Sequence, residues 1–176
     1  MSEVVLREWR RSDDSALVRL LEMQCKADPN WPPPYARDSD LAQWLGLPAN
    51  ICRWVAEEAG RVVGHMGLGT PSPMVMEIFN SARPDLAGRF VELCRTCVDE
   101  QARGSGVAGL LTRAAIKTAL AGQTVPVATV LTNREGWLEM MRRTRWQEIG
   151  RVPAVTMDDE LVCFLPPKKF VDAVSL

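Results

Sequence analysis

The sequence predicts an α/β fold in which a single mixed, mostly antiparallel central sheet is flanked by helices. Three observations lead to this fold class. Short β-rich runs alternate with stretches of helical apolar periodicity along the chain. Two of the β-rich runs are joined by a hairpin signal, which makes them antiparallel neighbours. The 176 residues are 47% apolar and contain no repeat and no linker, so we expect one domain over residues 1–176.

The N-terminal segment is predicted to hold a strand and two helices around a stiff loop. Val4–Trp9 is extended and β-rich. Ser12 is a predicted N-cap, and the residues after it have helical spacing at Leu17, Leu20, Leu21 and Cys25. The prolines of Asp28–Tyr35 exclude regular structure, and Ser39–Leu45 is predicted to form a helical turn or two.

A hairpin and a long insertion follow. Cys52–Glu57 and Arg61–Leu68 are β-rich runs separated by Glu58-Ala-Gly, which is a hairpin signal. Thr70–Gly88 contains several prolines and an apolar patch, so we interpret it as an inserted loop with one helical turn. Loops of this kind often line a binding site.

The next segment is predicted to alternate between strand and helix. Phe90–Val98 is a strand, and Asp99–Gly104 is a polar turn. The helix after this turn has one apolar face, formed by Val107, Leu110, Leu111, Ala114, Ala115 and Thr118. Val125–Leu131 is β-branched and apolar, which is typical of a buried strand.

The C-terminal part is predicted to add one helix and two strands. Thr132-x-x-Glu135 has the pattern of a capping box, which predicts a helix that continues to about Arg143. Val152–Thr156 and Glu160–Leu165 are extended runs that complete the sheet.

Composition and charge restrict the classes of partner. A formal charge of -1 with mixed signs favours neither nucleic acid nor an anionic membrane. The sequence has no signal peptide and no apolar run of about 18 residues, so we expect a cytoplasmic protein. Five cysteines at irregular spacing do not form a disulfide framework, and Cys94-x-x-Cys97 has no second pair for a metal. We expect reduced thiols and no metal.

A glycine motif marks the start of one predicted helix. Gly104-Ser-Gly106-Val-Ala-Gly109 matches the GxGxxG pattern of dinucleotide-binding folds. Its surroundings fit that assignment poorly, because no Asp or Glu lies between Gln101 and Arg134 to hold a ribose. No Gly-Lys-Ser/Thr follows, which excludes a Walker loop. A nicotinamide-dependent oxidoreductase stays open as a remote alternative.

The same segment has the properties of a different phosphate cradle. Small residues allow consecutive backbone N–H groups to form an anion nest at the positive end of a helix. Arg103 adds a charge, and the ionisable residues between Gln101 and Arg134 are all basic. This pattern favours a polyanionic ligand.

Read as Arg103-x-x-Gly106-x-Ala108, the segment resembles the coenzyme A loop of the GCN5-related N-acetyltransferase (GNAT) family. Leu6-Arg-Glu is similar to the first strand of that family. The run from Trp54 to Met66 is similar to the hairpin that strands 2 and 3 form in the family. Glu92–Asp99 resembles its fourth strand. The resemblance implies the GNAT-like acyl-CoA N-acyltransferase fold.

The resemblance also implies an activity and a donor site. It implies transfer of an acetyl group from acetyl-CoA to a primary amine of a small molecule or a protein, by direct attack in a ternary complex. The implied cofactor-binding residues are Cys97, Val98, Arg103, Gly104, Ser105, Gly106, Val107, Ala108 and Asn133. A backbone amide at the end of the fourth strand could also hold the oxyanion of the tetrahedral intermediate.

Residues for proton transfer are harder to assign. Glu92 matches the position of a catalytic glutamate in histone-acetylating members and is our candidate base. Met140 and Met141 occupy the place of the usual tyrosine acid, and methionine cannot donate a proton. Tyr35, the only tyrosine, is the candidate substitute, and we interpret His65 as structural. A non-catalytic acyl-CoA sensor therefore stays open, as does a homodimer.

Overall fold

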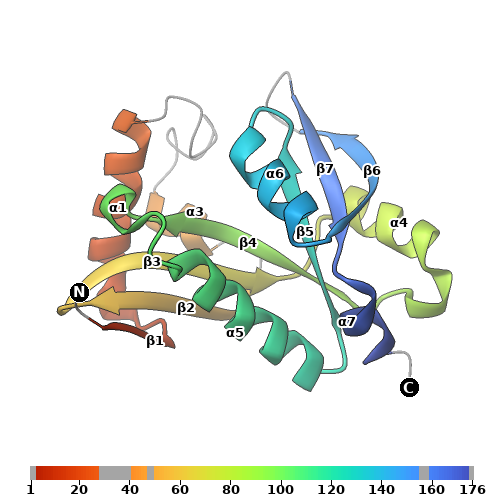
Figure 1. Cartoon of the computed structure of the whole chain (residues 1–176), viewed down its shortest axis with the longest axis horizontal. Helices are drawn as coiled ribbons and strands as arrows, with labels where there is room; N and C mark the ends of the chain where they lie inside the picture. The colour runs from red at the N-terminus through yellow and green to blue at the C-terminus, as the bar shows by residue number, and fades with distance from the viewer. Residues whose placement is uncertain (1–2, 28–40, 47–49, 155–158, 175–176) are drawn as a thin grey trace. The chain divides into compact units, whose positions relative to one another are not determined.

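A computed structural model describes residues 3–27, 41–46, 50–154 and 159–174 (Figure 1). Its strands form one seven-stranded sheet in the order β1-β2-β3-β4-β5-β7-β6, which confirms the predicted mixed sheet. β4 and β5 are parallel, whereas the pairs β1–β2, β5–β7 and β6–β7 are antiparallel. The strands are β1 (Val4–Glu8), β2 (Asn50–Glu58), β3 (Arg61–Gly69), β4 (Phe90–Val98), β5 (Val125–Leu131), β6 (Gln147–Pro153) and β7 (Glu160–Leu165).

The helices lie between these strands in the sequence, except for the last helix, which follows β7. They are α1 (Asp14–Ala27), α3 (Leu41–Gly46), α4 (Pro73–Ala82), α5 (Val107–Ala121), α6 (Glu135–Arg143) and α7 (Lys168–Asp172). Among the described residues, no helix combines the length and the apolar character needed to cross a membrane.

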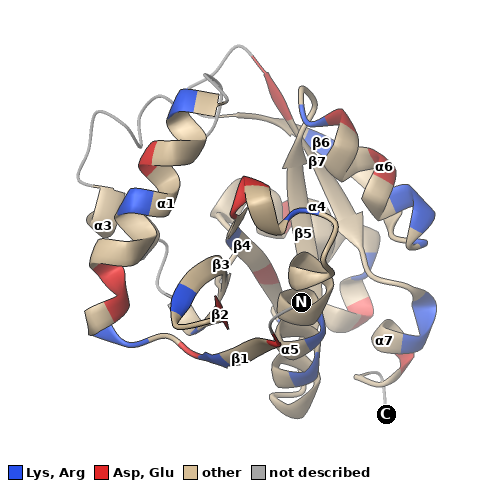
Figure 2. Cartoon of the chain, turned by 60° about the vertical axis from the view of Figure 1, so that its left-hand side comes forward, with Lys and Arg blue, Asp and Glu red and all other residues tan. Residues whose placement is uncertain are grey.

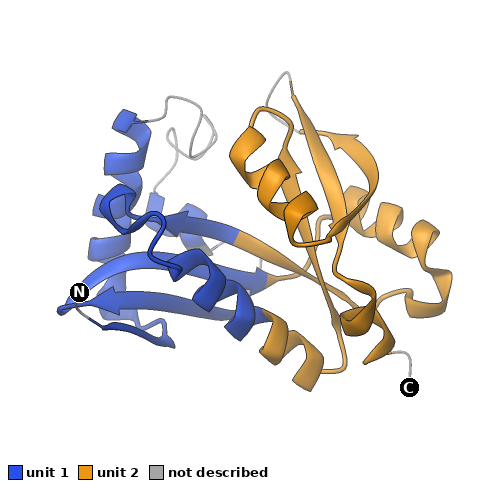
Figure 3. Ribbon diagram, in the orientation of Figure 1, with its two compact units in different colours: residues 1–68, 95–115 blue, residues 69–94, 116–176 orange. Residues whose placement is uncertain are grey.

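The chain forms two compact units (Figure 3). Unit 1 contains residues 1–68 and 95–115, and unit 2 contains residues 69–94 and 116–176. The boundary cuts β4 between Cys94 and Arg95, and it cuts α5 between Ala115 and Ile116. The assignment of residues 1–176 to a single domain stays a prediction.

Unit 1 has a core between α1, α3 and its strands. The buried residues of this core are Leu17, Leu20, Leu21, Trp44, Leu45, Val55 and Cys97. Gln24 is also buried on α1, whereas Cys25 is only partly buried. The apolar periodicity therefore predicted the buried face of α1, but it did not predict that the polar residue Gln24 is buried there.

The start of α1 differs from the prediction. Ser12 lies inside a 3-10 turn over Arg11–Asp13, and the carboxylate of Asp13 accepts a hydrogen bond from the backbone N–H of Arg10 at 2.7 Å. Arg7 holds the same carboxylate with two hydrogen bonds of 2.8 Å. Asp13, instead of Ser12, therefore closes the first turn.

The hairpin between β2 and β3 is confirmed. Its two turn residues, Ala59 and Gly60, have φ angles of 50° and 78°. Two successive residues with positive φ form the tight turn whose twist matches antiparallel strands.

Unit 2 corrects the prediction for Thr70–Gly88. Most of this segment is α4, ten residues long, followed by a 3-10 turn over Pro84–Leu86. Ser72 caps α4 by accepting from the N–H of Val75 at 3.4 Å, and Pro73 occupies its first turn, where a missing N–H costs nothing. Val75 and Phe79 anchor the helix in the core of unit 2. The prolines start and end the helix instead of excluding it.

Two further boundaries differ in unit 2. Helix α6 exists, but Thr132 does not cap it, because the hydroxyl of Thr132 donates to the carboxylate of Asp159. β6 begins at Gln147 and ends at Pro153, earlier than the predicted run Val152–Thr156. It is an edge strand with mostly exposed residues, so it lacks the apolar alternation by which strands are predicted.

Candidate functional site

The turn before α5 has the backbone of an anion-binding nest. Gly104 and Gly106 have φ angles of 80° and 87°, a region that favours glycine. A Cβ atom placed on either glycine would meet nothing within 4 Å, so the space above both is open. Gly106 also opens the helix, because its carbonyl accepts from the N–H of Leu110 at 3.0 Å.

The backbone N–H groups of this turn differ in whether they have an acceptor. Among the described residues, none accepts a hydrogen bond from the backbone N–H of Gly106, Val107, Ala108 or Gly109. Ser105 differs, because its N–H and its hydroxyl both donate to the carbonyl of Ala102. Consecutive free N–H groups at a helix N-terminus fit the oxygens of a phosphate.

A basic residue lies on either side of these N–H groups in the sequence. The Arg103 side chain is 58% exposed and lies 4.0 Å from Glu100, a distance at which a surface ion pair holds it only weakly. Arg113 reaches back along α5, since its Nη1 would lie 3.4 Å from a Cβ on Gly109. Figure 2 shows basic positions in blue on the ribbon of α5. The charge favours a polyanion at the start of this helix.

A buried aspartate fastens the turn to β3. Asp99 is 2% exposed, and its carboxylate accepts from Arg61 Nη1 at 2.5 Å and from the N–H of Gln101 at 2.8 Å. Its own N–H donates to the carbonyl of Val63 at 2.8 Å. Sequence reasoning treated Asp99 only as part of a polar turn, because its partner Arg61 lies far away in the sequence.

The end of β4 places Cys97 and Val98 differently. The backbone N–H of Asp99 donates to the carbonyl of Val63 on β3. Because backbone groups alternate in direction along a strand, the N–H and the carbonyl of Cys97 also face β3. The Cys97 thiol is buried, and burial raises its pKa to about 12, so it stays a neutral core group. The carbonyl of Val98 faces away from β3 and accepts from Gln24 Nε2 at 2.7 Å. Gln24 is a contact of this strand that the sequence did not indicate.

Glu92 and Asn133 belong to unit 2, whereas Arg103–Ala108 and Val98 belong to unit 1. Glu92 is partly buried in the stretch of β4 that pairs with β5, and its carboxylate accepts from the hydroxyl of Thr129. This contact between neighbouring strands limits the rotamers open to the glutamate.

Asn133 and Tyr35 complete the predicted set. The side chain of Asn133 is exposed directly after β5, and its backbone N–H lies within reach of Asp159. Hydrogen bonds from Thr132 and from this part of the backbone lower the pKa of the Asp159 carboxyl, although burial opposes them. Tyr35 lies outside the described residues, so its role as an acid stays a prediction.

His65 is structural, in agreement with its position in β3. The ring is fully buried, and burial lowers its pKa to about 4 with help from the charges of Arg53 and Arg95. Both ring nitrogens have partners within unit 1. A neutral ring without solvent contact is not placed to take a proton from a substrate.

Comparison with known proteins identifies the family and the fold of this chain. A family model described as "Acetyltransferase (GNAT) family" matches residues 15–143. No curated protein matches the chain. An N-acetyltransferase from Staphylococcus aureus Mu50 is 22% identical with a TM-score of 0.65, over 93% of this chain and 97% of its own.

Two other solved structures share the fold. The protein yncA from Salmonella typhimurium, solved with its cofactor acetyl-CoA, has a TM-score of 0.66 and 16% identity over 92% of this chain and 91% of its own. NAA60 from Arabidopsis thaliana, solved with a bisubstrate analogue, has a TM-score of 0.64 and 16% identity over 93% and 97%. At these identities the likeness shows a common fold.

Proposed function

Because the chain belongs to the GNAT acetyltransferase family, we propose that it transfers an acetyl group from acetyl-CoA to a primary amine. The observation that carries this proposal is that, in the described part of the chain, the N–H groups from Gly106 to Gly109 have no acceptor. They follow a turn with open space at Gly104 and Gly106, and Arg103 and Arg113 lie on either side of them in the sequence. Acetyl-CoA carries a pyrophosphate that such a row can bind. The acetyl-CoA complex of yncA supports the same donor.

The donor site is proposed to involve two parts of unit 1. The N–H groups of the turn and the guanidinium of Arg103 bind the pyrophosphate, and the backbone of Val98 faces the pantetheine arm. Gln24 already donates a hydrogen bond to the Val98 carbonyl. An amide N–H of the pantetheine arm therefore either shares this carbonyl with Gln24 or displaces the glutamine side chain. For Cys97 only a supporting place beside Val98 is proposed, since its thiol belongs to the core and its backbone faces β3.

The chemical step is proposed to be direct attack of the amine on the thioester carbonyl. An ammonium must first lose a proton, and the carboxylate of Glu92 is the proposed base, directly or through water. The C–S bond then breaks, and the leaving thiolate takes a proton from an acid, for which Tyr35 is the candidate. The bisubstrate analogue bound by NAA60 supports a ternary complex, since such a compound joins both substrates in one site.

A ligand comparison tests this function. Acetyl-CoA at about 100 times its Kd adds about 2.7 kcal/mol to the free energy of unfolding, so we expect a rise in Tm that NAD does not produce. Incubation with acetyl-CoA and a panel of amines should then release free coenzyme A. Stabilisation by NAD alone would assign the cradle to a dinucleotide. Binding of acetyl-CoA without release of coenzyme A across the panel would favour a sensor.

A further inference from the structure

Arg95 interrupts the regular conformation of β4. Its φ angle is 53°, a left-handed conformation that is unfavourable for an arginine. It is the first residue of unit 1 after the chain leaves unit 2, three residues before Val98. Contacts around Arg95 must therefore offset the cost of this backbone conformation.

His65 supplies one such contact. Its Nδ1 lies 2.8 Å from the carbonyl oxygen of Arg95. Its Nε2 accepts from Arg53 Nε at 3.2 Å, so Nε2 carries no proton and Nδ1 is the N–H that donates to the carbonyl. The ring is fully buried, and water cannot replace it as a donor.

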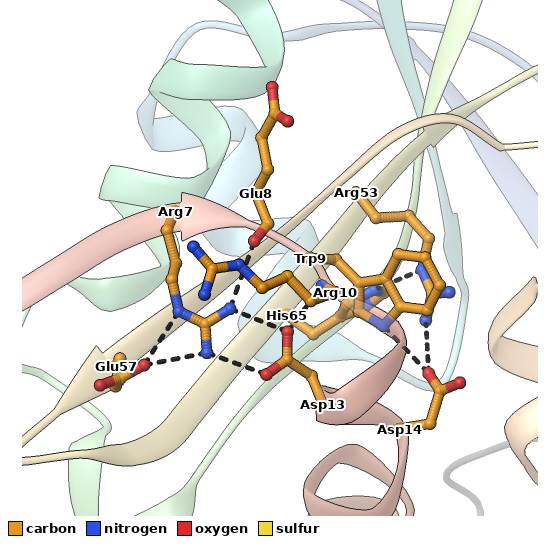
Figure 4. A network of polar contacts seen from close by, with 9 residues as sticks. All are labelled: Arg7, Glu8, Trp9, Arg10, Asp13, Asp14, Arg53, Glu57 and His65. Carbon is orange, nitrogen blue, oxygen red and sulfur yellow. Dashed lines mark hydrogen bonds and ion pairs between the residues drawn. The ribbon is translucent and has the colours of Figure 1, made fainter.

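The ring is itself held in place by the start of the chain (Figure 4). The Arg53 guanidinium lies 4.0 Å from the centre of the Trp9 ring. Trp9 Nε1 donates to Asp14 at 2.9 Å, and Arg53 lies 3.8 Å from the same carboxylate. These contacts fix the tautomer and the orientation of His65.

The side chain of Arg95 is fixed as well. Its guanidinium lies 4.1 Å from the centre of the Trp44 ring on α3. The backbone carbonyl and the side chain of this residue thus contact two different elements, β3 and α3. The contact of the Arg95 carbonyl with His65 and the contact of its guanidinium with Trp44 together stabilise the left-handed conformation.

We propose that His65 is a positioning residue, which holds the left-handed backbone of Arg95 and thereby directs the backbone of Val98 toward the donor thioester. The proposal rests on the function proposed above. It assigns to His65 a fixed donor role at the carbonyl of Arg95, with no proton transfer to substrate. The ring acts on the donor site through the strand that contains both residues.

Substitutions at His65 and Arg95 test this role. His65→Leu removes the donor, and we expect acetyl-CoA affinity to fall about tenfold, the equivalent of one buried hydrogen bond. His65→Asn keeps an N–H near the position of Nδ1 and should recover most of the affinity. Arg95→Gly removes the cost of positive φ, so adding His65→Leu to this variant should reduce affinity less than it does alone.

Arg7→Met is the matched control for lost stability. Arg7 contacts Asp13 and Glu57 in the neighbouring network (Figure 4), whereas the hydrogen bond under test joins His65 to the carbonyl of Arg95. We expect it to lower Tm while the acetyl-CoA affinity of the folded protein stays within about twofold. An equal loss of affinity in Arg7→Met and His65→Leu would overturn the positioning role.

Amide hydrogen exchange at residues 96–98 provides a readout that needs no ligand. His65→Leu should speed exchange there, and His65→Asn should restore protection. If the native chain fails to bind acetyl-CoA, the proposed function is wrong, yet these exchange rates still decide whether His65 holds the strand. Unchanged exchange in folded His65→Leu would contradict the inference.

Discussion

Gly64 on β3 lies directly beneath Val107, the first residue of α5. A Cβ atom on Gly64 would come 2.7 Å from Val107 Cγ1, closer than nonbonded carbon atoms approach. The same Cβ would lie 3.3 Å from the carbonyl oxygen of Cys97. The absent side chain therefore lets the start of α5, with its free N–H groups, sit close against the sheet of unit 1.

The first prediction follows from this contact. Gly64→Ala should cost about 1–3 kcal/mol of stability by overpacking and should weaken acetyl-CoA binding by moving the start of α5. Adding Val107→Ala removes the clashing methyl group and should recover part of both losses. Urea unfolding and calorimetric titration with acetyl-CoA measure the two effects. Full affinity in Gly64→Ala would show that the cradle does not depend on this packing.

A second prediction concerns Glu92. Glu92→Gln should lower kcat about a hundredfold, within the usual range for general base catalysis, and leave acetyl-CoA affinity unchanged. Glu139→Gln, on an exposed position of α6, is the control and should leave kcat unchanged. Steady-state kinetics with any accepted amine measure both. Native kcat in Glu92→Gln would remove this carboxylate from the mechanism.

Thr129→Val extends this test. The variant removes the hydroxyl that donates to Glu92 and keeps the size of the side chain. We expect a smaller loss of kcat than in Glu92→Gln, because the carboxylate is still present but free to change rotamer. A loss of acetyl-CoA affinity instead would point to a structural role for this pair.

The buried ring of His65 predicts a pH dependence of stability. Its pKa is about 4 in the folded chain against about 6.5 when unfolded, because burial and the charges of Arg53 and Arg95 oppose protonation. Above the unfolded pKa both states are neutral and the stability is fully present. As the pH falls below it, the unfolded chain binds a proton first, so stability falls until the folded pKa is reached.

By about pH 5 this linkage should remove about 2 kcal/mol relative to about pH 7.5. His65→Asn cannot bind that proton and should lose correspondingly less over the same interval. Urea unfolding of both proteins at the two pH values measures the difference. Parallel losses in the two proteins would mean that other groups cause the acid sensitivity.

The sequence predicted the parts of the fold that local patterns determine. Phe90–Val98 and Val125–Leu131 have the predicted boundaries, since both are β-rich runs bounded by turn residues. The glycine turn and the start of α5 also lie where the sequence indicates them, whereas coenzyme A binding at this turn stays a prediction. In contrast, α4 was predicted as a loop, because a proline in the first turn of a helix looks the same in sequence as one that breaks it.

Long-range polar contacts could not be predicted. The bonds from Gln24 to Val98 and from Arg61 to Asp99 join residues that are 74 and 38 positions apart. A polar residue on a helix face or in a turn gives no sign of a partner at that distance. The left-handed conformation of Arg95 could not be predicted either, because the contact that stabilises it comes from His65 on another strand.

Binding of acetyl-CoA to Gly106→Glu tests the central claim most directly. The substitution places a carboxylate at the start of α5, where nothing lies within 4 Å of a Cβ on Gly106. Gly60→Glu, in the β2–β3 turn, is the matched control, with a φ angle of 78° against 87° and nothing within 4 Å of a Cβ. We predict that calorimetric titration detects binding to Gly60→Glu and none to folded Gly106→Glu. Equal affinity in the two variants would contradict the assignment of this turn as the phosphate cradle.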